Sequence, residues 1–349
     1  MSVQTIDKNR QWLLHSRPKG RPTLENFKQV ETDIPKPQSG QILLRTVYLS
    51  LDPYMRGRMS NAESYADPVA LGDVMVGGSV CRVMKSEHPD YAVGDWVVSY
   101  GGWQDYHLSN GQSVVKLPED MVYPSYGIGV LGMPGFTAYM GLLDIGRPQE
   151  GETVVVAAAT GAVGSVVGQV AKIKGARAVG IAGGMEKCRY AVETLGFDVC
   201  IDHQAEDFAE QLRAACPQGI DVYYENVGGK VFDAVLPLLN TKARIPLCGL
   251  ISQYNAESLP EGSDRLPLLM GTILRKRMTV RGFIIFDDYG AQYPQFIQQM
   301  TQWLQEGKIR YREHRIDGLD QAPQGLIDLL DGKNFGKVIV QVGEEKNPN

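Results

Sequence analysis

Apolar residues in the first third of the chain occur in short runs with the two-residue spacing of β-strands. These runs contain alternating or β-branched residues and are separated by Gly, Pro and Asp, which favour turns. They cover 41–48, 78–84, 95–100 and 113–117. The pattern predicts a mostly β, barrel-like unit in this part of the chain.

From about residue 148 the pattern changes to short apolar strands that alternate with helices. The predicted strands are 152–158, 177–182, 198–202, 221–227, 244–249 and 279–285, and the helices between them are 163–174, 185–195, 208–215 and 231–239. A further helix is predicted at 293–306. Six strands joined by helical crossovers indicate a Rossmann-type, doubly wound parallel sheet.

The last apolar run, 337–342 (KVIVQV), predicts a strand well beyond this series. We expect so late a strand to return to the first, β-rich unit, which makes that unit discontinuous. The expected organisation is a β-rich domain formed by 1–130 and 308–349, with a dinucleotide-binding domain at 131–307 inserted in it. The active site is then expected in the cleft between the two domains.

Composition and charge exclude several kinds of protein. With 43% apolar and 21% charged residues, the chain has the composition of a globular protein and not of a disordered one. Lys and Arg number 35 against 40 Asp and Glu, and the net charge of −5 argues against a nucleic-acid partner. The uncharged stretches 121–143 and 153–171 contain Pro or several Gly, so we expect them to be buried and not to span a membrane.

The cysteines indicate the compartment. There are five, which is an odd number, and they are widely spaced with no C-x-x-C pair. Residues 1–10 are polar and charged and lack the apolar centre of a signal peptide. The sequence therefore predicts free thiols and a cytoplasmic protein.

A glycine-rich turn follows the first strand of the second series. The strand 152–158 runs directly into A-x-G-x-x-G, in which Ala159 takes the position of the first Gly and is followed by Gly161 and Gly164. Gly161 allows the backbone to approach a pyrophosphate, and Gly164 allows the helix to pack closely on the strand. Alone, this motif also fits a tight turn in any α/β protein. Its place at the first strand–helix junction of a six-strand series favours dinucleotide binding.

The end of the second strand favours NADPH over NADH. NAD enzymes place Asp or Glu there to bind the ribose 2′-hydroxyl. In this chain the segment 182–187 (AGGMEK) begins with three small, neutral residues instead. Lys187 follows one helical turn later, where a cation could bind a 2′-phosphate. Glu186 could instead bind a ribose, and Lys187 could be an ordinary exposed lysine.

Ligands for a metal are missing from the N-terminal part. A catalytic zinc needs three Cys, His or carboxylate ligands, and a structural zinc needs four. The first 130 residues hold one cysteine, Cys81, and three histidines, His15, His88 and His107, with no ligand spacing between them. We therefore expect no metal, and a developing negative charge in a substrate would be stabilised by tyrosine or cofactor hydroxyls.

Six motifs occur in an order that resembles a known family. They are 50–56 (SLDPYMR), 131–139 (LGMPGFTAY), 161–164 (GAVG), 225–229 (ENVGG), 248–255 (CGLISQYN) and 334–337 (NFGK). Together they resemble the zinc-free medium-chain dehydrogenase/reductases of the alkenal and prostaglandin/leukotriene reductase group, and within it the bacterial NADPH-dependent curcumin/dihydrocurcumin reductases. The resemblance spans nearly the whole chain.

The resemblance implies reduction of the carbon–carbon double bond of an α,β-unsaturated ketone or aldehyde. Hydride from NADPH would reach the β-carbon, and an enolate would form and be protonated at the α-carbon. By position in the family motif, Tyr254 is the hydrogen-bond donor to the enolate oxygen, helped by the cofactor ribose hydroxyl, and Tyr54 lines the substrate cleft. Tyr54 could instead pack in the core after Pro53, and Tyr254 could be a loop aromatic that gates the cofactor.

The resemblance also implies the cofactor contacts, position by position. The matching residues are Gly161, Ala162, Val163, Gly164, Lys187, Asn226, Cys248, Gly249, Ile251, Phe283 and Asn334. Met133 matches a residue beside the nicotinamide, on the substrate side. Many relatives have Tyr after the third strand, where this chain has His203, whose imidazole could face the 2′-phosphate or lie in an exposed loop.

The family further implies a GroES-like fold for the β-rich domain and a homodimer joined through the sheet edge of the nucleotide domain. Two other functions stay open. One is an NADPH-dependent quinone oxidoreductase of the same superfamily, and the other is a noncatalytic NADPH-binding protein. The motifs around Tyr54 and Tyr254 favour the enone reductase.

Overall fold

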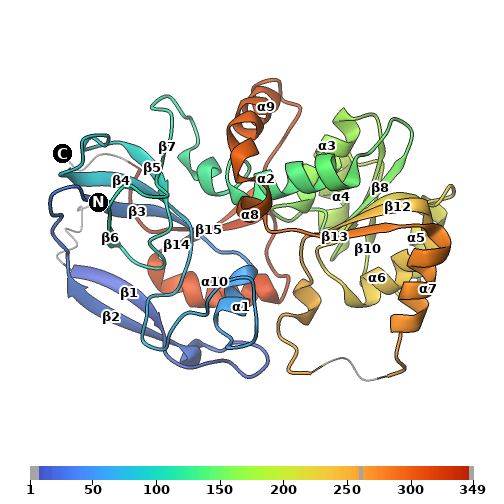
Figure 1. The fold of residues 1–349 in the computed structure, drawn as a ribbon, viewed down its shortest axis with the longest axis horizontal. Coiled ribbons are helices and arrows are strands. Elements are labelled where there is room, and N and C mark those ends of the chain that lie inside the picture. The colour runs from blue at the N-terminus through green and yellow to red at the C-terminus, as the bar shows by residue number, and fades with distance from the viewer. Residues whose placement is uncertain (1–7, 259–261, 346–349) are drawn as a thin grey trace. The chain divides into compact units, whose positions relative to one another are not determined.

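The computed structural model describes residues 8–258 and 262–345. The chain forms two compact units, each of which is drawn in Figure 1. The first unit contains the chain up to Gly129, together with 313–334 and the residues from Val338 on, and the second contains 130–312 and 335–337. Residues 1–7, which include most of the stretch used to argue against a signal peptide, lie outside the described residues.

The second unit is built on a six-stranded sheet. Its strands are β8 (Thr153–Ala157), β9 (Arg177–Ala182), β10 (Val199–Asp202), β11 (Ile220–Tyr224), β12 (Leu239–Leu247) and β13 (Thr279–Gly282). They lie in the order β10-β9-β8-β11-β12-β13, and every neighbouring pair is parallel. The predicted doubly wound sheet is therefore confirmed, with its switch point between β8 and β11.

Helices connect these strands and lie on both sides of the sheet. They include α3 (Gly164–Ile173), α4 (Met185–Glu193), α5 (Phe208–Ala215), α6 (Gly229–Val235) and α7 (Leu266–Lys276). The chain moves in opposite directions from the switch point, and right-handed crossovers then place α3 and α4 on the face opposite α6 and α7. Figure 1 shows the strands between these two pairs of helices.

Strand β12 and helix α7 are among the elements of this unit that differ from the prediction. Strand β12 begins at Leu239, whereas a helix was predicted to continue to that residue. Pro237 lies in the short 3-10 turn just before it, where its ring cannot continue α-helical hydrogen bonding. Helix α7 was not predicted, and Pro267 at its start obscures an apolar stripe that is suited to a helix.

Apolar runs explain why the inner strands form a parallel sheet. All five residues of β8 (TVVVA) are buried, as expected for a strand covered by helices on both faces. The core around it includes Val155, Val179, Ile181 and Tyr223. The rigid sheet built in this way fixes where the loops at the carboxyl ends of its strands begin.

The first unit contains a mainly antiparallel seven-stranded sheet and a separate strand pair. The sheet contains β3 (Ile42–Ser50), β4 (Ser79–Ser86), β5 (Trp96–Ser99), β6 (Tyr106–Ser109), β7 (Val115–Lys116), β14 (Glu313–Asp317) and β15 (Lys337–Gln341). The pair is β1 (Lys8–Leu14) with β2 (Phe27–Asp33). Strand β15 pairs antiparallel with β3, so the last strand returns to the β-rich unit as predicted.

The helices of the first unit are α1 (Tyr54–Arg58) and α10 (Ala322–Leu330), and the second unit also contains α2 (Met133–Met140), α8 (Ile285–Tyr289) and α9 (Tyr293–Gln305). Residues 308–312 belong to the second unit, where the backbone N–H of Arg310 donates to Gln169 on α3 over 2.8 Å. Across the described residues, no helix is long and apolar enough to cross a membrane.

Candidate functional site

The glycine-rich turn joins β8 to α3. Ala158 has φ 54°, in the left-handed region, and the N–H of Gly161 donates to its carbonyl oxygen over 2.9 Å. A Cβ at Gly164 would overlap that same oxygen, and one at Gly161 would lie 3.2 Å from it. Gly164 therefore lets the start of α3 pack directly on the end of β8, and a side chain at Gly161 would crowd the same carbonyl oxygen, which is the close packing that the glycine-rich motif requires.

The alanine at the first glycine position has a structural explanation. Ala159 is fully buried, and its Cβ would lie 2.8 Å from a Cβ placed at Gly180 on the neighbouring strand β9. The methyl group at Ala159 is thus accommodated because Gly180 has none. Ala162 and Val163 complete the turn and are half-buried.

Lys187 lies in the first turn of α4, which follows β9. Its side chain is half-buried, and burial lowers its pKa while the charge of Glu186 opposes that shift. The exposed His203 follows β10, and its Nε2 would lie 3.0 Å from a Cβ at Gly183. The ends of the neighbouring strands β9 and β10 thus bring His203 next to the turn that begins α4.

Asp202 holds the turn between β9 and α4, a role that was not predicted from the sequence. Its Oδ1 accepts the N–H of Gly184 and the N–H of Gln204, each over 2.9 Å. The carboxylate at the end of β10 is therefore bound to backbone and fixes the start of α4. Its place at the end of a predicted strand was the available signal, but that position alone does not show what it binds.

Asn226 follows β11 and connects it to β8 across the switch point. Its Nδ2 donates to the carbonyl oxygen of Ala157 over 2.8 Å. Its own carbonyl oxygen accepts the N–H of Ile251 over 3.2 Å, in the loop after β12. The predicted residues Asn226 and Ile251 are therefore joined directly by the backbone.

The loop after β12 carries Cys248, Gly249 and Tyr254. The side chain of Tyr254 folds back so that its hydroxyl oxygen would lie 2.9 Å from a Cβ at Gly249, and it accepts the N–H of Leu250 over 3.3 Å. Gly249 therefore makes the room that this hydroxyl occupies. Cys248 is half-buried as a residue, but its thiol points inward, and burial raises the pKa of the thiol to about 12, so it stays protonated at neutral pH.

Two predicted residues of the second unit lie on other elements. Phe283 follows β13 and is buried, with its ring centroid 6.1 Å from that of Tyr289. Met133 begins α2 and is half-buried, and the Thr137 hydroxyl donates to its carbonyl oxygen over 2.7 Å. The Tyr224 hydroxyl donates to the carbonyl oxygen of Thr137 over 2.7 Å. This contact ties α2 to the sheet.

Tyr54 and Asn334 belong to the first unit, and both are half-buried. Burial is the main cause that raises the pKa of Tyr54, and the nearby Asp52 adds to it, so the phenol stays protonated. The Arg58 guanidinium lies 5.8 Å from the Tyr54 ring centroid. The part that these two residues take in the site of the second unit stays a prediction.

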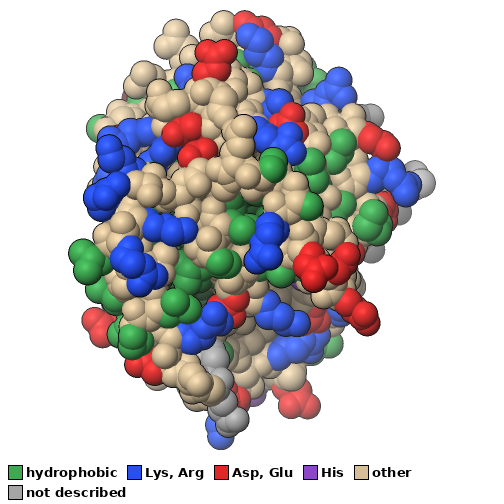
Figure 2. Space-filling view, turned by 90° about the vertical axis from the view of Figure 1, so that its right-hand side faces the viewer, with side chains coloured by type: hydrophobic (Ala, Val, Ile, Leu, Met, Phe, Trp, Pro, Cys, Tyr) green, Lys and Arg blue, Asp and Glu red, His purple; other side chains and the backbone are tan. Residues whose placement is uncertain are grey.

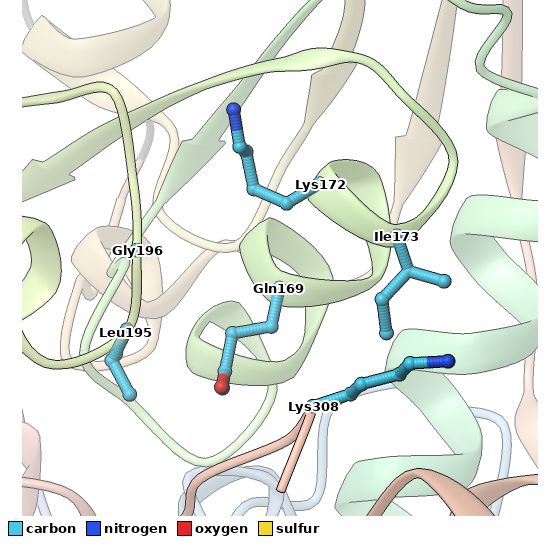
Figure 3. A pocket seen from close by; sticks show the side chains of 6 residues that line it. All are labelled: Gln169, Lys172, Ile173, Leu195, Gly196 and Lys308. Atoms are coloured by element: carbon cyan, nitrogen blue, oxygen red, sulfur yellow. The ribbon is translucent and has the colours of Figure 1, made fainter. Parts of the chain in front are cut away.

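A hollow of about 310 Å³ in the second unit is a different feature (Figure 3). Its lining consists of Gln169, Lys172, Ile173, Leu195, Gly196 and Lys308. The Lys172 ammonium is paired with Asp198 at 2.8 Å, and the Gln169 amide is bonded to the carbonyl oxygens of Ser165 and Arg310. None of the predicted site residues lines this hollow, and its polar groups already have partners.

The structure also bears on metals and thiols. All five cysteines are within the described residues and are free. Within 8–258 and 262–345, no three His, Cys, Asp or Glu side chains are grouped so that they could hold a metal ion.

Comparisons with known proteins agree with this geometry. Two family models match the chain, "N-terminal domain of oxidoreductase" at residues 10–117 and "Zinc-binding dehydrogenase" at residues 162–305. The chain is 65% identical to the NADPH-dependent curcumin reductase of Escherichia coli, over 97% of this chain and 98% of the relative. It is 39% identical to tobacco NADP(+)-dependent 2-alkenal reductase, over 97% and 98% of the two chains. Rat prostaglandin reductase 1 is also 39% identical, over 95% and 98%.

Solved structures give the same result. CurA from Vibrio vulnificus superposes with a TM-score of 0.94 at 64% identity, over 97% of this chain and 100% of that chain. A second structure of CurA, in complex with NADPH, matches with the same TM-score and identity over 96% and 99% of the two chains. The predicted fold class and family resemblance are thus confirmed, and the chain belongs to the medium-chain dehydrogenase/reductase family, in the group of the curcumin, alkenal and prostaglandin reductases.

Proposed function

We propose that this protein is an NADPH-dependent reductase of the carbon–carbon double bond of α,β-unsaturated ketones and aldehydes, including curcumin-type enones. The observation that carries the proposal is the 65% identity, over nearly the full length of both chains, to a curcumin reductase. The alkenal and prostaglandin reductases among its relatives support the wider substrate class.

The cofactor contacts follow from the loops at the carboxyl ends of the strands. The turn from Gly161 to Gly164 would hold the pyrophosphate against the N-terminus of α3. Lys187 would bind the 2′-phosphate, and His203 lies at the same turn to assist it. The residues proposed for the nicotinamide side are Asn226, Cys248, Gly249, Ile251, Phe283 and Asn334.

Tyr254 would act on the substrate. When bound, NADPH supplies the hydride for the β-carbon. The substrate's carbonyl oxygen then gains negative charge, and a phenol hydroxyl can donate a hydrogen bond to it. The N–H that Leu250 donates to the Tyr254 oxygen polarises the phenol and strengthens its own donation. Tyr54 and Met133 would line the substrate side.

A steady-state assay tests this function. Oxidation of NADPH is followed by its near-ultraviolet absorbance with a simple enone, with curcumin and with a quinone, and the product is identified by mass spectrometry. We expect turnover of the enones with saturation of their double bond. Turnover of the quinone alone would support the quinone oxidoreductase instead, and NADPH binding without any turnover would support a noncatalytic protein.

The proposal includes a homodimer joined through the edge strand β13. All four of its residues are exposed, and an edge strand presents unpaired backbone groups to another chain. Helix α7, which precedes it, exposes Leu266, Leu268, Met270 and Leu274, the last to 78%. Apolar exposure on this scale beside an open sheet edge fits an interface between two copies.

Substitutions in α7 and β13 test the dimer. We expect the native protein to show about twice the 38.4 kDa chain mass in light scattering. The double change Leu274→Glu and Val280→Glu should shift it to the monomer, because it buries like charges at the interface. The control is Val122→Glu, since Val122 is also 78% exposed but lies in the other unit. A native monomer, or a dimer that survives the double change, would contradict this interface.

We propose no nucleic-acid partner and a cytoplasmic location. Figure 2 shows the face at the right of Figure 1, where basic side chains are interspersed with acidic, apolar and neutral ones. The five free cysteines, all in the described part of the chain, support a reducing compartment.

A further inference from the structure

Glu225 is a buried acid that the proposed reaction does not use. It directly follows β11, and only 1% of its surface is exposed. Its Oε1 accepts the Tyr223 hydroxyl over 2.9 Å, the N–H of Val227 over 2.7 Å and the N–H of Gly228 over 2.9 Å. Its Oε2 is buried and has no hydrogen-bond partner among the described residues. One carboxylate oxygen therefore holds the whole turn after β11.

That turn holds the next loop by its backbone. The carbonyl oxygen of Glu225 accepts the N–H of Cys248 over 3.0 Å and the N–H of Gly249 over 3.2 Å. The carbonyl oxygen of Val227 accepts the N–H of Ser252 over 3.1 Å and its hydroxyl over 2.5 Å. The loop that carries Tyr254 is thus attached to the residues whose conformation Glu225 fixes.

Without these hydrogen bonds, the glycines that follow β11 would be free to adopt other backbone conformations. Gly228 and Gly229 have φ values of 76° and 57°, and glycine populates many other conformations as readily. Burial is the main influence on Glu225 and raises its pKa, while the backbone N–H groups oppose this shift. Burying a carboxylate costs free energy unless hydrogen bonds compensate for it. The Val227 and Gly228 N–H groups supply these hydrogen bonds, and they would lack an acceptor without the carboxylate.

We propose that Glu225 is a positioning residue that fixes the Tyr254 hydroxyl by holding the turn 226–228, a role that rests on the proposed function of Tyr254. The hydrogen bonds to the Glu225 carboxylate come from the Tyr223 hydroxyl and from the backbone of 227–228. The carboxylate acts through the hydrogen bonds from Val227 and Gly228 and through the backbone ladder to 248–252. Displacement of a donor by even a fraction of an ångström lowers the rate without removing the donor.

The first arm of the test is hydrogen exchange of the cofactor-free protein, read by mass spectrometry in Glu225→Gln. The amide oxygen can still accept at the place of Oε1, but it carries no charge, and an amide nitrogen is buried at the unpartnered place of Oε2. We expect faster exchange in the peptides that contain Val227, Gly228 and 248–252, with unchanged exchange in β8 and α3.

The second arm is kinetic. In Glu225→Gln, kcat for an enone should fall roughly 10-fold, and the Kd for NADPH should change by a clearly smaller factor, because only the nicotinamide-side contacts lie on this turn and loop while the pyrophosphate and 2′-phosphate contacts are untouched. Tyr223→Phe, which removes one donor and keeps the ring in the core, should shift both readouts in the same direction by a smaller factor. It also serves if Glu225→Gln fails to fold.

Glu313→Gln is the matched control. The side chain of Glu313 is also an acid with little exposure (7%), and its Oε1 has no partner among the described residues. Glu313 lies in the other unit, however, and is paired with Arg315. Local exchange and kcat unchanged in both Glu225→Gln and Tyr223→Phe would overturn the inference. So would a general rise in exchange that Glu313→Gln reproduces, since that shows only lost stability. Absence of enone turnover by the native protein would refute the proposed function, while the exchange arm still reports on the turn.

Discussion

Tyr254→Phe should lower kcat for enone reduction by about 10²- to 10³-fold, the cost of removing one preorganised donor to a developing oxyanion. The change deletes only the hydroxyl oxygen that accepts the N–H of Leu250, and the ring that folds over Gly249 remains. NADPH affinity should therefore stay nearly constant. Stopped-flow single turnovers measure the chemical step, and fluorescence titration measures the Kd for NADPH.

Tyr91→Phe is the control for this change. The Tyr91 hydroxyl donates to the carbonyl oxygens of Gly111 and Val114 in the first unit, so its loss removes hydrogen bonds without affecting the loop after β12. We expect native kcat from it. An unaltered rate in Tyr254→Phe would remove Tyr254 from the mechanism and leave the cofactor ribose hydroxyl as the main donor.

Lys187→Ala should weaken NADPH binding by about 10- to 100-fold, as expected for the loss of a hydrogen bond to a charged group. NADH lacks the 2′-phosphate, so its Kd should change far less. Burial lowers the pKa of Lys187, because it disfavours the charged ammonium. A bound 2′-phosphate would stabilise the ammonium, so lysine and phosphate would stabilise each other. Isothermal titration with each cofactor measures the difference.

The control for the lysine is Lys172→Ala, because Lys172 is already paired with Asp198 beside the hollow of Figure 3. Neither cofactor should lose affinity in this variant. Equal losses for NADPH and NADH in Lys187→Ala would show that Lys187 does not distinguish them, and His203 would then be the next candidate.

The sheet of the second unit could be predicted because its strands are apolar on both faces. A run such as TVVVA in β8 has no polar face to turn toward water, so both faces of the strand have to be covered. A parallel sheet with helices on both sides provides this cover. Strands β1 and β2 were missed because they pair mainly with each other and carry many exposed polar residues, as in FKQVETD. Local patterning does not show which polar strand finds a partner.

The candidate site was predictable where a residue's role follows from its own local sequence. Spacing alone predicted the turn at Gly161 and Gly164, because the glycines are needed by the backbone next to them. Glu225 and Asp202 were missed, since what they do depends on hydrogen bonds within turns whose geometry a sequence pattern does not give. The fold of Tyr254 over Gly249 is of the same kind.

The central claim is that hydride goes to the β-carbon of an enone, with Tyr254 at the carbonyl oxygen. It is tested most directly with NADPH that carries deuterium at the transferable position, with each face of the nicotinamide labelled in turn. The product is analysed by NMR. We predict deuterium at the β-carbon for one of the two labels, a solvent-derived proton at the α-carbon and an intact carbonyl group. Deuterium at the carbonyl carbon, which gives an alcohol and leaves the double bond in place, would contradict the account.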